Sequence, residues 1–181
     1  MCGINGFNFK NDELIFKMSS CTRSRGPDFT DYFKSENYSV SHNRLAIIDP
    51  EDRSNQPFKY KNLILSFNGE IYNFLELKQK LKSRGHDFLT NSDTEVIIKL
   101  FHEYKEESFK LLSGIFALSI YDLTLNKIYL IRDQVGVKPL YYYYDVKNNK
   151  FAYSSLIKPL LIVSNEKKLN REAIKYYSNF N

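Results

Sequence analysis

The chain has 181 residues, and a hydrophobic fraction of 43% with 14 Tyr and 14 Phe is typical of a packed globular protein. Its first residues contain no basic or apolar leader, and no apolar run reaches the roughly 18 residues of a membrane span. The formal net charge of +5 is spread along the chain, which disfavours a nucleic-acid partner. We therefore expect one soluble, cytoplasmic domain with no membrane or nucleic-acid partner.

The two cysteines, Cys2 and Cys21, are too few for a disulfide framework. Neither they nor the three histidines, His42, His86 and His102, have the clustered spacing of a zinc site. We expect no metal and no cofactor in this chain.

The first half of the chain predicts strands that alternate with helices. A strand is expected from Cys2 to Phe9, a helix from Leu14 to Cys21, and a loop at 23–28 where Gly and Pro interrupt regular structure. Further strands are expected at 40–48 and 63–67. Asn68-Gly69 follows the second of these, and by itself this pair is the strongest short signal for a β-hairpin turn.

Two helices are expected next. Apolar residues recur at helical spacing from Asn73, and Gly85 supplies a stop. Ser92 and Glu95 form a capping-box pattern ahead of a second amphipathic segment that runs to Tyr104.

The second half is rich in short β segments separated by turn residues. Strands are expected at 116–121, 127–131, 140–144 and 151–153, which suggests antiparallel hairpins, and a last helix is expected at 170–177. This order of elements predicts an α+β fold in which helices cover the outer faces of stacked sheets.

Cys2 is the residue with the clearest chemical potential. A free thiol with a pKa of about 8.5 is mostly protonated at neutral pH and needs a base to become a nucleophile. Removal of Met1 would leave Cys2 with its own α-amine, whose reference pKa of about 7.7 to 8.0 suits a general base. Met-Cys alone is more often a coincidence of sequence, so this hypothesis depends on the rest of the chain.

Several motifs accompany Cys2 in one order. They are Met1-Cys2-Gly3-Ile4, Arg25-Gly26-Pro27-Asp28, His42-Asn43-Arg44-Leu45-Ala46-Ile47-Ile48-Asp49, Gln56-Pro57, Phe67-Asn68-Gly69-Glu70-Ile71-Tyr72-Asn73 and Ser92-Asp93-Thr94-Glu95-Val96-Ile97. Later motifs are Leu112-Ser113-Gly114, Arg132-Asp133, Gly136, Lys138-Pro139-Leu140-Tyr141-Tyr142 and Phe151-Ala152. Together they resemble the class II glutamine amidotransferase domain of the asparagine synthetase family, a branch of the N-terminal-nucleophile hydrolases. The resemblance spans nearly the whole chain, residues 1–181.

The resemblance implies a four-layer αββα sandwich of two mostly antiparallel sheets, with the nucleophile at the start of a strand. It also implies that Cys2 attacks the glutamine amide, forms a glutamyl thioester and releases ammonia. The Asn68 side chain and the Gly69 backbone N–H would form the oxyanion hole, a role that requires two such donors.

The same resemblance assigns the residues that would recognise L-glutamine. Arg44 would bind the substrate carboxylate, because its guanidinium can donate two parallel hydrogen bonds. Asp93, assisted by Glu70, would bind the ammonium. Asp93 also has a second explanation, because an acid in the first turn of a helix is favoured by the helix dipole.

The sequence departs from the family pattern at a few positions. Ser155 stands where the family has an acid, and Asn43 and Gln134 replace residues that are often charged. Residues from about 165 to 181 are expected to begin a linker or helix that leads to a synthetase domain absent from this sequence. ATP and Mg²⁺ would be needed only in that domain.

Several alternatives stay open at this stage. The chain could be a domain of a longer synthetase, a truncated reading frame, or a separate subunit that docks on an ammonia-consuming partner, and it could form a homodimer. An N-terminal-nucleophile amidase with another substrate and a catalytically silent interaction module are the rival functions.

Overall fold

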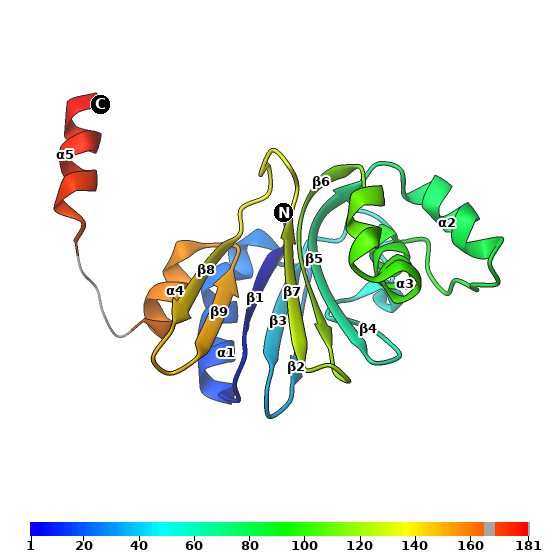
Figure 1. Ribbon diagram of the computed structural model, residues 1–181, viewed down its shortest axis with the longest axis horizontal. Coiled ribbons are helices and arrows are strands. Elements are labelled where there is room, and N and C mark those ends of the chain that lie inside the picture. Colours follow the sequence, from blue (N-terminus) through cyan, green and yellow to red (C-terminus); the bar gives the residue numbers. More distant parts are fainter. Residues whose placement is uncertain (165–168, 181) are drawn as a thin grey trace.

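The computed structural model describes residues 1–164 and 169–180. Two antiparallel sheets stack face to face, and helices cover the outer face of each, so the described chain forms four layers in the order α, β, β, α (Figure 1). The predicted α+β sandwich is confirmed.

The first sheet has five strands in the order β2-β3-β1-β9-β8. Their bounds are β1 (Gly3–Phe7), β2 (Phe29–Lys34), β3 (Ser39–Arg44), β8 (Tyr141–Asp145) and β9 (Lys150–Ser154). Both neighbours of β1 are antiparallel to it, and all five of its residues are buried. The strand that follows Cys2 therefore lies at the centre of its sheet.

The second sheet has four strands in the order β4-β5-β6-β7. Their bounds are β4 (Phe58–Tyr60), β5 (Leu63–Ile71), β6 (Gly114–Asp122) and β7 (Lys127–Arg132). Each strand is antiparallel to its neighbour, and β5 pairs with β6 along its whole length.

The helices complete the outer layers. On the first sheet lie α1 (Asp12–Thr22) and α4 (Ile157–Val163). On the second lies α3 (Asp93–Tyr104), and α2 (Phe74–Lys82) packs against α3 (Figure 1). Short 3₁₀ turns occur at η1 (Arg23–Arg25), η2 (Asp52–Ser54) and η3 (Lys105–Leu111). Helix α5 (Arg171–Phe180) lies away from the four layers (Figure 1).

Each of the three interfaces between layers has its own apolar core. Alternation along β5 shows how one strand serves two of them: Leu63 and Leu65 pack toward the helices, whereas Ile64 packs toward the other sheet. Tyr38 and Tyr153 fill the space between the sheets, and their hydroxyls share a hydrogen bond of 2.5 Å. By the same alternation, Asn68 shares its side-chain orientation with Ile64 and faces the first sheet.

The structure corrects several predicted boundaries. The expected strand at 40–48 ends at Arg44, because the chain turns away there and the guanidinium of Arg44 binds carbonyl groups of the loop that follows. Strands β2 and β4 and helix α4 were not predicted. Strands β2 and β4 have partly exposed side chains and no strong local pattern. They form because they pair with β3 and β5, respectively.

The hairpin interpretation of Asn68-Gly69 is wrong. Both residues lie inside β5, opposite Ala117 and Phe116 of β6. A Cβ atom on Gly69 would lie 2.2 Å from the carbonyl oxygen of Ile115, so glycine is required here by the close approach of β6.

The capping box at the start of α3 is half correct. Ser92 caps the helix, since its hydroxyl accepts a hydrogen bond from the N–H of Thr94 at 3.1 Å. The Glu95 carboxylate does not return to Ser92. It accepts instead from the backbone N–H groups of Leu89 and Thr90, which fixes the segment before the helix.

The expected linker or helix at about 165–181 is described only in part. Residues 165–168 and 181 lie outside the described residues, and the predicted helix at 170–177 corresponds to α5. Within the ranges 1–164 and 169–180, no helix has the length and apolar character required to cross a membrane.

Candidate active site

A pocket of about 120 Å³ lies between the start of β1, the C-terminal half of β5 and the N-terminus of α3. It brings together all six residues that the sequence singled out: Cys2, Arg44, Asn68, Gly69, Glu70 and Asp93. Its remaining lining residues are Met1, Leu45, Ile47, Ile48, Ser54, Gln56, Phe67, Ser92, Thr94 and Lys138.

Cys2 lies immediately before β1, with its thiol beside the end of β3. The N–H of Leu45 donates to Sγ at 3.4 Å. Burial raises the pKa of the Cys2 thiol, while the Leu45 hydrogen bond and the positive charges of the N-terminus, Arg44 and Arg25 act in the opposite direction. Because burial dominates, the thiol needs a base to become a thiolate near neutral pH.

The loop at 23–28 holds the chain end that carries Cys2. Arg25 donates from Nε to the carbonyl of Cys2 at 3.0 Å. Gly26 packs so closely on β3 that a Cβ atom would lie 2.1 Å from the carbonyl oxygen of Asn43. Asp28 accepts a hydrogen bond from the N–H of Ala46 at 2.8 Å. The loop therefore fixes the backbone on both sides of the nucleophile.

Asn68 is 1% exposed, and its side-chain Nδ2 is a buried donor with no hydrogen-bond partner among the described residues. The preceding residue, Phe67, is held through both of its backbone polar groups. The N–H of Phe67 donates to Gln56 Oε1 at 2.7 Å, and the carbonyl oxygen of Phe67 lies 3.0 Å from Nε2 of His42. An unpaired buried N–H group costs about 1 to 3 kcal/mol, so this rigidly held donor is poised for an acceptor that enters the pocket.

Arg44 ends β3 with its side chain only 4% exposed overall. Its guanidinium already binds the chain: Nη2 donates to the carbonyl of Asp49 at 2.6 Å, and Nη1 donates to Oδ1 of Asn55 at 2.7 Å. Further carbonyl contacts are made with Ile48, Pro50 and Glu51. Arg44 therefore fixes the loop after β3 and also places a positive charge in the pocket wall.

Asp93 lies in the first turn of α3 and is 3% exposed. Burial raises its pKa to about 6, although the N–H groups of Ile71 and Thr94 and the Ser92 hydroxyl lower it. Nearby Glu70 adds to the increase. Glu70 itself is exposed at the pocket rim, so of the two acids Asp93 is the enclosed one.

Sequence reasoning missed several pocket residues. Gln56, Thr94 and Lys138 line the cavity and belong to matched motifs, yet they received no role. Leu45 contacts the Cys2 thiol through its backbone, which no side-chain pattern can reveal. Ser155, a departure from the family pattern, lies outside the pocket and accepts a hydrogen bond from the N–H of Ile4 at 3.0 Å. Within the described residues, no group of three or more His, Cys, Asp or Glu could hold a metal ion.

The four-layer fold and the pocket around Cys2 are those of an amidotransferase with a cysteine near its N-terminus. Comparisons with known proteins identify the family. The model of the glutamine amidotransferase domain family matches residues 1–181. Asparagine synthetase [glutamine-hydrolyzing] 1 of Bacillus subtilis is 37% identical over 190 residues, which cover 99% of this chain and 30% of that protein. The corresponding enzyme of Zea mays is 42% identical over 129 residues, or 70% of this chain and 22% of its own length.

A solved structure supports the fold. The glutamine phosphoribosylpyrophosphate amidotransferase of B. subtilis superposes with a TM-score of 0.74 at 20% identity, covering 90% of this chain and 43% of that one. The chain belongs to the glutamine amidotransferase domain family. It spans about a third or less of the length of the B. subtilis and maize relatives.

Proposed function

We propose that this chain hydrolyses L-glutamine and delivers the ammonia to a synthetase domain or subunit. The observation that carries the proposal is a single pocket that holds Cys2 next to the N-terminal Met1, an unpaired amide donor, a buried cation and a buried acid. These are the groups required to attack an amide and to recognise an amino acid that carries both charges.

The nucleophile is the Cys2 thiolate, formed once Met1 is removed. The free α-amine takes the thiol proton, and sulfur bonds to the amide carbon of glutamine. The resulting ammonium returns a proton to the amide nitrogen as the carbon–nitrogen bond breaks, so that ammonia leaves and a glutamyl thioester remains. Water then cleaves the thioester to glutamate and the free thiol.

The oxyanion of the tetrahedral intermediate would accept hydrogen bonds from the Asn68 side chain and the Gly69 N–H. Two features support this assignment: Nδ2 of Asn68 lacks a partner among the described residues, and Gly69 lines the same pocket next to it. Rigid donors of this kind stabilise the developing charge without a cost of reorganisation.

Substrate recognition would use the two ends of the pocket. The Arg44 guanidinium would attract the carboxylate, and Asp93 with Glu70 would attract the ammonium. Since burial holds the pKa of Asp93 at about 6, this acid is ionised at neutral pH and becomes more so when an ammonium ion binds.

The test is a glutaminase assay on a chain whose N-terminus has been verified by intact mass, together with labelling by a glutamine-like electrophile. Wild type should release glutamate and be labelled at Cys2. Cys2→Ala should do neither, and retention of Met1 should abolish turnover. Labelling at Cys21, or a preference for asparagine or simple amides over glutamine, would favour one of the rival functions.

The ammonia acceptor is proposed from the relatives. Because the chain matches glutamine-hydrolysing asparagine synthetases over 30% of the B. subtilis protein, we infer that its partner is a synthetase domain that makes asparagine with ATP and Mg²⁺. Addition of that domain should couple glutamine hydrolysis to asparagine formation. Equal rates and equal coupling with and without it would contradict the inference.

A further inference from the structure

Two segments far apart in sequence form the wall of the pocket between Arg44 and Asp93. One is the loop at 45–55, which follows β3, and the other is the segment at 89–92, which leads into α3. Ile48 and Ser54 from the first segment and Ser92 from the second line the pocket. The distance between the two segments therefore affects the distance between the proposed binding groups for the two charges of glutamine.

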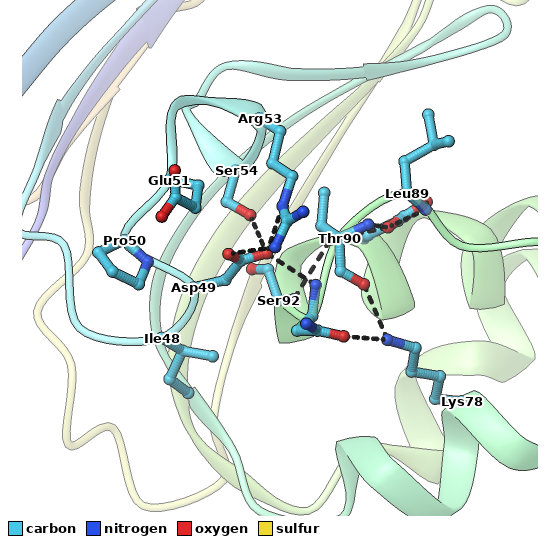
Figure 2. Close-up of polar contacts among 12 residues, drawn as sticks. Ile48, Asp49, Pro50, Glu51, Arg53, Ser54, Lys78, Leu89, Thr90 and Ser92 are labelled. Carbon is cyan, nitrogen blue, oxygen red and sulfur yellow. Dashed lines mark hydrogen bonds and ion pairs between the residues drawn. The ribbon is translucent and has the colours of Figure 1, made fainter.

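Asp49 connects these segments. Its carboxylate accepts hydrogen bonds from the backbone N–H of Asn91 at 2.7 Å and from the Ser54 hydroxyl at 2.9 Å, and it pairs with Arg53 at 3.0 Å. Figure 2 shows the Asp49 carboxylate among these groups, with Arg53 and Ser54 on one side and the segment that contains Thr90 and Ser92 on the other. We refer to Asp49, Arg53, Ser54 and Asn91 as the Asp49 clasp.

The same residue also contacts Arg44. The backbone carbonyl of Asp49 accepts from Arg44 Nη2 at 2.6 Å, while its side chain holds Asn91, 42 positions further along the chain. Asp49 has a φ of 46°, in the left-handed region that only a few non-glycine residues adopt. One residue in a sparsely populated conformation thus links Arg44 to the segment at 89–92, which directly precedes Asp93.

The environment keeps the Asp49 carboxylate charged and fixed. Its side chain is 3% exposed. The Arg53 guanidinium lowers its pKa to about 2, with further contributions from the Asn91 N–H and the Ser54 hydroxyl. It therefore remains an anion throughout the pH range in which the Asp93 carboxyl, with a pKa of about 6, titrates.

The segment at 89–92 is held from its other side as well. Lys78 of α2 donates to the carbonyl of Thr90 at 2.8 Å and to Oδ1 of Asn91 at 3.2 Å (Figure 2). Glu95 of α3 accepts from the N–H and the hydroxyl of Thr90, both at 2.7 Å. Because α2 and α3 already anchor this segment, the Asp49 clasp fastens the loop at 45–55 to a rigid support.

We propose that Asp49 is a positioning residue that sets the spacing between the carboxylate and ammonium sites for glutamine. It touches neither the thiol nor the oxyanion donors, so its loss should weaken substrate binding and leave the chemistry of Cys2 intact. This inference rests on the proposed glutaminase function.

The test compares Asp49→Asn with Asp87→Asn in the chain processed to expose Cys2. Asp87 is an exposed acid four positions before Asn91, so its substitution removes the same charge without touching the clasp. We expect Asp49→Asn to raise the KM for glutamine about tenfold, with kcat and the rate of Cys2 alkylation by iodoacetamide within about twofold of wild type. Asp87→Asn should leave all three quantities unchanged.

A KM within about twofold of wild type, or a proportional loss of kcat and alkylation rate, would overturn the proposal. If Asp49→Asn does not fold, as judged by circular dichroism, Arg53→Ala decides instead: a rise in KM of about threefold supports the proposal, and an unchanged KM overturns it. If wild type itself does not hydrolyse glutamine, the proposed function fails, and this inference fails with it.

Discussion

Asp93 has two possible roles, stabilisation of the α3 dipole and binding of the substrate ammonium, and one substitution distinguishes them. Asp93→Asn keeps the size of the side chain and removes its charge. If the acid serves only the helix dipole, the substitution should destabilise the protein by about 0.3 to 1 kcal/mol at every pH at which the acid is ionised. If it is a substrate anchor buried at a cost to stability, the effect should have the opposite sign near neutral pH.

The magnitude follows from the raised pKa. An acid whose pKa rises from 3.8 to about 6 binds its proton more tightly in the folded protein than in the unfolded chain. Below pH 3.8 Asp93 is protonated in both the folded and the unfolded state, so it does not affect the free energy of unfolding. Above pH 6 the group is ionised in both states, and its burial lowers the free energy of unfolding by the full amount. A difference of about two pKa units corresponds to roughly 3 kcal/mol.

Thermal unfolding of wild type and Asp93→Asn at pH 4 and pH 7.5 measures this effect. The Tm of the variant minus the Tm of wild type should be roughly 6 to 12 °C larger at pH 7.5 than at pH 4. Glu76→Gln, at an exposed acid in the first turn of α2, is the matched control and should show no such shift.

The same variant should lose affinity for glutamine. The KM should rise roughly 10- to 150-fold, since a charge-assisted hydrogen bond contributes about 1.5 to 3 kcal/mol. A variant that is less stable than wild type at pH 7.5 and binds glutamine normally would refute the reasoning and leave Asp93 as a helix-dipole residue.

Other predictions follow from the same pocket. Asn68→Ala should lower kcat about 100- to 1000-fold with little change in KM, because the lost donor acts on the oxyanion; a change confined to KM would argue against that role. In wild type, protonation of Asp93 should lower kcat/KM as the pH drops through about 6, in addition to the loss caused by protonation of the Cys2 α-amine, and only the Asp93 contribution should be absent from the pH profile of Asp93→Asn. Gly69→Ala should destabilise the fold, since its Cβ would lie 2.2 Å from a carbonyl oxygen of β6; an unchanged Tm would contradict that packing argument.

The sequence by itself determined the ordered set of motifs, the fold class and the residues that meet in the pocket. Local patterns also predicted the antiparallel hairpins of the second half and the Ser92 cap of α3, because turn chemistry and helix capping depend on neighbours within a few positions. Cys2, Asn68 and Asp93 could be selected from the motifs without knowing how the chain folds.

Only the tertiary structure decided what these groups do to one another. Asn68-Gly69 lies in a strand rather than a turn because β6 pairs along the whole of β5, which overrides the local preference of the pair. The pKa of Asp93 depends on burial, and the connection from Asp49 to Asn91 spans 42 positions. Such contacts are created when distant segments pack, so no window of sequence contains them.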